Sequence, residues 1–273
     1  MKTVAVTGSF DNLRSKHVRF LEEAAKFGSV HVALWSDETV QAQEGRPPRF
    51  PEQERDYLLR SLRFVDHVTV VRGSIEPDAL PDLGAVKPDI WIVEQDRDAT
   101  GKRIYAAARG VQYRVIWNAE LSGFPVPSCS PPALDLARKR VMVTGCYDWF
   151  HSGHVRFFEE ASALGDLYVV VGHDANITLL KGAGHPLLSQ DERLYMVHAV
   201  RFVHQAMIST GHGWLDAEPE IALVKPHLYV VNEDGDKPEK RAFCGEHGIE
   251  YVVLKRIPKE GLPRRESTDL RGF

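Results

Sequence analysis

The chain has 273 residues, enough for two domains of ordinary size, and 43% of them are hydrophobic, enough for a core in each. Its formal net charge of −4 gives no electrostatic case for binding nucleic acid or an anionic membrane surface. The three cysteines lack zinc-like spacing, the amino terminus lacks the apolar region of a signal peptide, and no apolar run approaches the ~20 residues of a membrane span. We therefore expect a soluble, cytoplasmic protein with no membrane span.

An internal repeat relates the two halves of the chain. The segments that match in register are 4–11 with 141–148, 17–20 with 154–157, 63–65 with 201–203, and 86–88 with 224–226. A register held over most of each half predicts two copies of one fold. Between them, four prolines in the nine residues 124–132 predict an extended linker. We expect one domain at 1–123, a proline-rich linker at 124–138, and a second domain at 139–273.

The second copy shows its elements most clearly. In chain order, apolar runs predict strands at 140–144, 167–172, 228–231 and 251–254, and helical periodicity predicts helices at 154–164, 190–203 and 238–247. Strands that alternate with helices form a parallel sheet. The predicted fold class is α/β, with two tandem Rossmann-like, doubly wound parallel-sheet domains. Such sheets bind ligands beyond the carboxyl ends of their strands.

The loop after the first strand of the second copy contains the candidate chemistry. It reads Gly145-Cys-Tyr-Asp148-Trp-Phe-His151-Ser-Gly153-His154 and leads into a helix. Both histidines can point into the mouth of the site, where imidazoles donate hydrogen bonds to phosphate and can carry charge near neutral pH. Gly153 would let the backbone approach a phosphate, and free helix N–H groups would add to an anion site. Asp148 either fixes the turn or orients the nucleotide.

This loop resembles the signature of the cytidylyltransferase-like nucleotidyltransferases, which join a nucleoside triphosphate to a phosphorylated alcohol or sugar and release pyrophosphate. The resemblance implies catalytic roles for His151, His154 and Lys181. The expected nucleotide-binding residues are Gly145, Cys146, Tyr147, Asp148, Gly153 and Arg201, then Arg264, Arg265, Ser267 and Thr268 in a shortened second signature. Asn232 and Asp234, which follow the third core strand, are also expected near the nucleotide. An acid usually follows Arg-[Tyr/Phe]-Val in this family, but His204 stands there, whereas the first copy keeps Asp66.

We expect CTP as the nucleotide, with a phosphorylated alcohol or sugar as the acceptor. ATP with a sugar phosphate is the alternative within the same class, and a nucleotide-binding protein without turnover is the alternative outside it. Mg²⁺ would be bound mostly by the triphosphate, because this ion prefers phosphate and water ligands.

The first copy has lost these features. Arg14 replaces the first histidine, Lys16 replaces the glycine, and Glu44 replaces Lys181. No Ser-Thr signature follows its last strand. We therefore expect a degenerate, inactive domain that packs against the second as an internal pseudo-dimer, while pairing of two chains through their second copies stays possible.

Overall fold

The computed structural model describes residues 1–125 and 137–270. It divides into two compact units, Met1–Gly123 and Phe124–Phe273. Most of the linker expected at 124–138 lies outside the described residues. Within the described ranges, no helix is both long and apolar enough to cross a bilayer.

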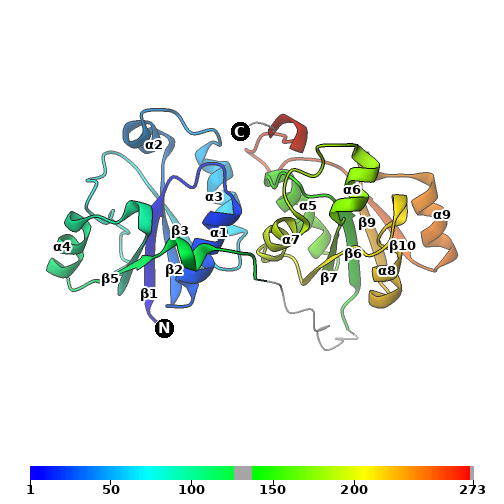
Figure 1. Cartoon of the computed structure of the whole chain (residues 1–273), viewed down its shortest axis with the longest axis horizontal. Coiled ribbons are helices and arrows are strands. Elements are labelled where there is room, and N and C mark those ends of the chain that lie inside the picture. Colours follow the sequence, from blue (N-terminus) through cyan, green and yellow to red (C-terminus); the bar gives the residue numbers. More distant parts are fainter. Residues whose placement is uncertain (126–136, 271–273) are drawn as a thin grey trace. The chain divides into compact units, whose positions relative to one another are not determined.

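The first unit is a five-stranded, all-parallel sheet in the order β3-β2-β1-β4-β5. Its strands are β1 (Thr3–Gly8), β2 (Ser29–Trp35), β3 (His67–Val71), β4 (Ile90–Glu94) and β5 (Gln112–Ile116). Its helices are α1 (Ser15–Ala25), α2 (Asp37–Glu44), α3 (Glu52–Arg60) and α4 (Thr100–Ala108), with short 3-10 helices η1 (Gln95–Arg97) and η2 (Asn118–Leu121). In Figure 1, α4 lies on one side of this sheet and α1 and α3 lie on the other.

The second unit is also all parallel, in the order β10-β9-β6-β7-β8. This is the order of the first unit counted from the opposite edge, with β6 in the central place of β1. Its strands are β6 (Arg140–Gly145), β7 (Asp166–Val171), β8 (Gln205–Ile208), β9 (Leu228–Asn232) and β10 (Glu250–Leu254). Its helices are α5 (Ser152–Ser162), α6 (Asp174–Lys181), α7 (Gln190–His198), α8 (Glu218–Val224) and α9 (Pro238–Glu246), with 3-10 helices η3 (Gly213–Leu215), η4 (Glu233–Gly235) and η5 (Ser267–Leu270). The expected α/β class with two Rossmann-like parallel sheets is confirmed.

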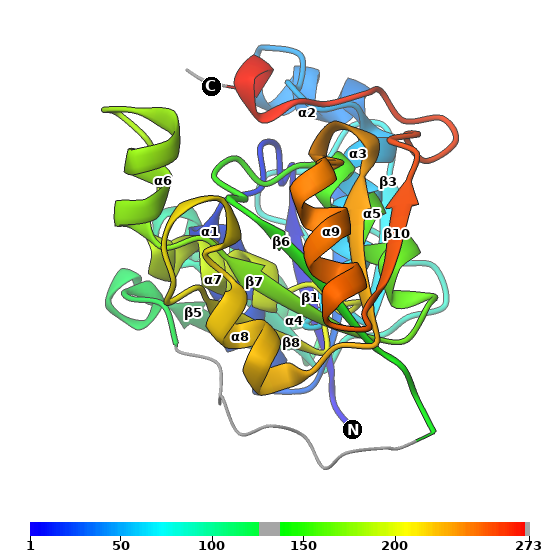
Figure 2. The same ribbon diagram turned by 90° about the vertical axis from the view of Figure 1, so that its right-hand side faces the viewer.

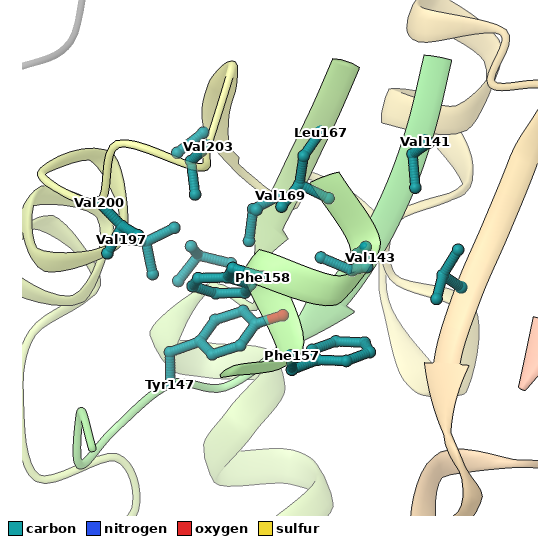
Figure 3. Close-up of a cluster of buried hydrophobic side chains, with 14 of the residues drawn as sticks. Val141, Val143, Tyr147, Phe157, Phe158, Leu167, Val169, Val197, Val200 and Val203 are labelled. Carbon is teal, nitrogen blue, oxygen red and sulfur yellow. The ribbon is translucent and has the colours of Figure 1, made fainter. Parts of the chain in front are cut away.

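Alternation along β6 divides the core of the second unit into two layers. Val141 and Val143 face α5 and α7 in one buried cluster, whereas Met142 faces α8 and α9 in another. Figure 3 shows the first cluster, in which Phe158 of α5 lies over the valines of the sheet, and Figure 2 looks onto the face covered by α8 and α9. Burial of each such side chain stabilises the fold by about 1.5–3 kcal/mol, so this core fixes α5, whose amino end carries the histidines.

Four elements of the second unit depart from the sequence expectations. Strand β8 has only four residues and was not predicted, and neither were helices α6 and α8. The helix expected at 190–203 ends at His198, although Val200 and Val203 remain buried beyond it. The apolar spacing therefore continues through a turn that packs on the same core, and periodicity alone does not separate that turn from the helix.

Candidate active site

The loop between β6 and α5 is shaped by a buried aromatic ring. Tyr147 adopts a positive φ of 55°, and its ring folds back over the end of β6. A Cβ on Gly145 would lie 2.7 Å from that ring, so only glycine fits there. Tyr147 itself is 5% exposed and packs edge-on against His154, with ring centroids 5.2 Å apart. Its ring, visible beside Phe158 in Figure 3, forms the wall behind the histidine.

The two histidines stack on each other at the amino end of α5. Their ring centroids are 4.0 Å apart with an interplanar angle of 23°. His151 caps the helix, because its Nδ1 accepts a hydrogen bond from the Gly153 N–H at 3.1 Å. An Nδ1 that accepts carries no proton, so the neutral ring has its proton on Nε2 and that atom can donate to a ligand.

Gly153 has a different neighbour from the one the sequence suggested. A Cβ at this position would lie 2.9 Å from the His151 ring and 3.5 Å from the Arg265 carbonyl oxygen. The glycine therefore makes room for the folded-back imidazole of His151. Its expected contact with phosphate stays a prediction.

Both histidines are held in the neutral form. Burial, together with the charges of Arg256 and Arg265, lowers the pKa of His151 to about 3. Burial also lowers the pKa of His154 well below its usual value, with smaller contributions from His151, Arg256 and Lys181. The expectation that these imidazoles carry charge near neutral pH is therefore wrong, because burial keeps both pKa values below that range. They offer N–H donors to an anion without a net charge.

The two units differ in how they use the second histidine. In the first unit, Nδ1 of His17 accepts a hydrogen bond from the Arg14 N–H at 3.0 Å. The corresponding Nδ1 of His154 is enclosed, and no group in the described part of the chain bonds to it. A buried polar atom without a partner is uncommon and costs free energy. His154 therefore differs from His17 in having an enclosed Nδ1 whose hydrogen-bonding capacity the described residues leave unused.

Arg256 is the main residue that sequence reasoning missed. It lies just past the end of β10, donates to Asp234 at 2.8 Å and to the Arg265 carbonyl oxygen at 3.1 Å, and its charge lowers the pKa of both histidines. It thus brings the predicted Asp234 and Arg265 together beside the histidine pair. No motif marks Arg256, but its place after a strand that lies beside β9 could have indicated it.

The carboxyl-terminal segment lies against the histidine loop. The Ser267 hydroxyl donates to the Trp149 carbonyl oxygen at 3.3 Å and lies 3.4 Å from His151 Nε2. Arg264 is exposed and pairs with Glu266 at 3.3 Å. The cleft between this segment and α5, lined among others by Gly153 and Asn232, encloses about 20 Å³, close to the volume of one water molecule. The Thr268 side chain lies outside the described residues.

Lys181 ends α6, which follows β7 at the same edge of the sheet. Its charge lowers the pKa of His154, and it counters the raised pKa that burial gives the Cys146 thiol. Lys181 therefore belongs to the electrostatic surroundings of the histidine pair, and the catalytic role that the resemblance implied stays a prediction.

Two predicted nucleotide residues serve the framework in this structure. The Asp148 carboxylate is buried and accepts the N–H groups of Leu187 and Leu188, each at 2.9 Å. The Cys146 carbonyl oxygen accepts from the fully buried Arg193 at 2.6 Å. Asp148 thus fixes the loop that follows α6, and Arg193 ties the histidine loop to the sheet.

Arg201 is not brought to the site. It lies between α7 and β8, at the amino ends of the strands, where the His204 N–H donates to the Leu167 carbonyl oxygen at 2.8 Å. The histidine loop is at the carboxyl ends. In the first unit, Asp66 at the position of His204 accepts the Val30 N–H at 2.8 Å. The acid expected at this position therefore has a structural role, and its replacement by His204 leaves the histidine pair untouched.

Fold and site together define the class: a parallel α/β unit with a stacked pair of buried histidines at a helix amino terminus. A family model described as cytidylyltransferase-like matches residues 142–261. The chain is similar to the FAD synthase of Aciduliprofundum boonei, with 36% identity over 49% of this chain and 84% of that protein. It is also similar to the bifunctional protein HldE of Methylococcus capsulatus, with 38% identity over 43% of this chain, although the match spans only 25% of that longer protein.

A second FAD synthase, from Methanoculleus marisnigri, is 35% identical over 44% of this chain and 77% of its own length. Among solved structures, a lipopolysaccharide core biosynthesis protein from Thermoplasma volcanium is 26% identical over 44% of this chain and 98% of its own, with a TM-score of 0.38. The chain belongs to the cytidylyltransferase-like family of nucleotidyltransferases. The family model covers only the second unit, so it does not extend to the first copy.

Proposed function

We propose that the second unit transfers an adenylyl group from ATP to the phosphate of a small phosphorylated acceptor and releases pyrophosphate. The sequence alone favoured CTP, but the relatives support the ATP alternative. FAD contains an adenylate whose phosphate is joined by a single phosphoanhydride bond to the phosphate of flavin mononucleotide, so a synthase of this family that makes FAD draws its adenylate from ATP. We therefore replace CTP with ATP, and flavin mononucleotide and sugar phosphates become the first acceptors to test.

The stacked pair His151 and His154 is the observation that carries this proposal. Both rings stand at the amino end of α5, where free N–H groups and the helix dipole favour an anion. The Nε2 of His151 faces a polar atom already, the Ser267 hydroxyl at 3.4 Å. A phosphate oxygen in place of that hydroxyl would accept the same hydrogen bond.

The reaction needs positioning more than proton transfer. An oxygen of the acceptor phosphate attacks the α-phosphorus of ATP, the bond from that phosphorus to the bridging oxygen breaks, and pyrophosphate leaves with the electron pair. A phosphate dianion is already a nucleophile and loses no proton. His151 and His154 would donate to the α-phosphate, and Lys181, Arg256 and Arg265 would balance the charge that develops on the leaving pyrophosphate.

Magnesium fits this scheme as a partner of the triphosphate. The described residues contain no group of three or more histidine, cysteine, aspartate or glutamate side chains that could hold a metal ion. Mg²⁺ usually keeps several waters and binds through substrate phosphates, so such a cage is not required. When bound, the ion would neutralise part of the charge of the triphosphate. Lys181, Arg256 and Arg265 would contact the phosphate oxygens that the ion does not.

We also propose that the first unit does not catalyse this reaction. Arg14 occupies the place of His151, and Lys16, which pairs with Asp96 at 3.1 Å, occupies the place of Gly153. Glu44 ends α2 where Lys181 ends α6, and it pairs with Arg46 at 3.0 Å. Glu44 therefore cannot supply the positive charge that Lys181 supplies in the second unit, and it engages a neighbouring cation instead.

Pyrophosphate release by the whole chain tests the proposal. The protein is mixed with Mg²⁺ and either ATP or CTP, and with flavin mononucleotide, a sugar phosphate or glycerol 3-phosphate. We expect release with ATP and at least one acceptor, and release from CTP at a far lower rate. Faster release with CTP would overturn the choice of nucleotide, and no release with any pair would overturn the proposed activity for these acceptor classes.

A further inference from the structure

The first unit contains a larger cavity than the cleft beside the histidine pair. It has a volume of about 240 Å³ and lies at the carboxyl ends of β1 and β4, with His17 in its lining. Its walls are aromatic, formed among others by Phe10, Trp35 and Trp91. The Trp35 indole N–H donates to the Thr7 hydroxyl at 2.8 Å, so this ring is fixed in place. Concave, mostly apolar hollows with a few polar groups are the usual form of small-molecule sites.

Two cations line this cavity and form no ion pair in the described part of the chain, although Glu94 lies near Arg97 and Asp78 and Asp98 lie near Lys102. Arg97 lies over the Trp35 ring, with its guanidinium carbon 5.5 Å from the ring centroid, and forms no ion pair there. Lys102 donates to the Arg97 carbonyl oxygen at 2.6 Å and likewise forms no ion pair. Burial lowers the pKa of Lys102, with Arg97 adding to the effect. An anion bound between these two side chains would relieve their repulsion.

Two enclosed polar atoms of the lining also lack partners in the described ranges. They are Oε1 of Glu94, the last residue of β4, and the indole Nε1 of Trp91, a residue that is 1% exposed. Burial raises the pKa of the Glu94 carboxyl group. One such atom offers an acceptor and the other a donor, which together suit the edge of a heteroaromatic base.

We infer that this cavity binds a nucleoside monophosphate, with its base between the aromatic walls near Glu94 and Trp91 and its phosphate on Arg97 and Lys102. The open hollow that shares Trp35 and Arg97 with this cavity is lined by Asp11 and Glu44, which both pair with Arg46, so beyond Arg97 its described residues offer no unpaired cation to a longer polyphosphate. The unit would bind this ligand without turning it over, since it lacks the histidine pair.

Titration calorimetry of the whole chain with AMP tests this inference, with adenosine and inorganic phosphate as separate probes. Arg97→Ala removes the anion partner, and Ala79→Leu fills the cavity from its lining. Arg109→Ala is the matched control, because Arg109 stacks on Tyr105 at 3.7 Å in the same unit and is not part of the lining. Thermal unfolding of each variant shows whether the first unit remains folded. A second control, His154→Ala, disables the site of the second unit.

We expect AMP to bind more tightly than adenosine or phosphate alone, and Arg97→Ala to weaken AMP binding by about tenfold or more, as loss of a charged hydrogen bond does. Ala79→Leu should also weaken it, while Arg109→Ala and His154→Ala should leave it unchanged. Pyrophosphate release should be unchanged in Arg97→Ala, which separates this site from the proposed activity. Equal AMP affinity in wild type and in both cavity variants, loss of binding in His154→Ala, adenosine binding as tightly as AMP, or no AMP binding would each overturn the inference.

Discussion

The burial of His151 and His154 determines both their charge state and their hydrogen bonding. They are neutral because they are enclosed near cations, and their hydrogen bonds are incomplete: Nδ1 of His154 has no partner in the described residues, and Nε2 of His151 has only the Ser267 hydroxyl at 3.4 Å. Sequence reasoning located both, because the spacing of glycine and histidine after a strand has few structural explanations. It did not anticipate the neutral charge state, which depends on burial and on Arg256, a residue about a hundred positions away in the chain.

The depressed pKa of His151 predicts an acid-sensitive fold. In the unfolded chain a histidine titrates near pH 6.5, whereas His151 in the folded protein titrates at about 3. Between these values the unfolded state binds more protons, so the free energy of unfolding falls as pH drops below about 6.5 and is fully recovered above it. His151→Asn should reduce the difference in this free energy between pH 7.5 and 5.5 by about 1 kcal/mol.

Urea unfolding of the wild type and of His151→Asn at pH 7.5 and 5.5 measures this difference in unfolding free energy. The same pH dependence in both proteins would show that His151 titrates normally in the folded state.

Arg256 and Arg201 show where residue-level reasoning reached its limit. Arg256 has no motif, and its contacts with Asp234 and Arg265 arise from the neighbourhood of β9 and β10 in the sheet. Arg201 matched a family segment, but only the unpredicted strand β8 reveals that it lies at the amino edge. The omission of Arg256 and the misplacement of Arg201 have the same cause. The order of the strands decides which residues meet, and local sequence does not encode that order directly.

At the scale of elements, one buried arginine in each unit ties the first loop to the sheet. Arg193 of α7 donates to carbonyl oxygens of Cys146, Gly172 and Leu188 and to the Asp174 carboxylate. Arg55 of α3 makes the equivalent bonds to Ser9, Trp35, Phe50 and Asp37. The repeat therefore preserves a framework even where the proposed catalytic residues differ.

Loss of the arginine should destabilise the unit that contains it. Arg193→Met leaves three carbonyl oxygens and one carboxylate without this donor, and we expect the second unit to lose about 3–5 kcal/mol of unfolding free energy. Arg55→Met is the matched variant and should destabilise the first unit instead. Hydrogen exchange followed by peptide mass spectrometry assigns the loss to a unit. Protection that stays at wild-type level in the affected unit would contradict this role.

The amino end of α5 depends on a glycine that the His151 ring covers. Gly153→Ala would place a Cβ 2.9 Å from that ring, so the imidazole must turn away from its present position. We expect pyrophosphate release to fall by about tenfold or more, since small displacements at a reaction centre are costly, with little loss of stability.

Gly245→Ala is the control, because nothing lies within 4 Å of a Cβ at that position of α9. It should leave turnover unchanged and slightly stabilise the helix. Full activity in Gly153→Ala would show that the ring position is unimportant.

Over the whole molecule, two sheets with the same strand order differ in what they offer a ligand. The sequence repeat was sufficient to predict two parallel α/β units, because apolar runs and helical periods recur in register in both halves. It could not reveal the cavity beside Trp35 and Arg97, since those side chains meet only through the order of β2, β1 and β4. The proposed division is one unit that catalyses and one that binds.

A pair of matched histidine variants tests this division most directly. His154→Ala and His17→Ala remove the equivalent side chain from the second and first unit, and pyrophosphate release from ATP with an accepted phosphate substrate is measured for both. We predict that His154→Ala lowers the rate by about 10²–10³, as loss of a transition-state donor does, and that His17→Ala retains the wild-type rate. Near-normal turnover in His154→Ala, or an equal loss in His17→Ala, would contradict catalysis by the second unit alone.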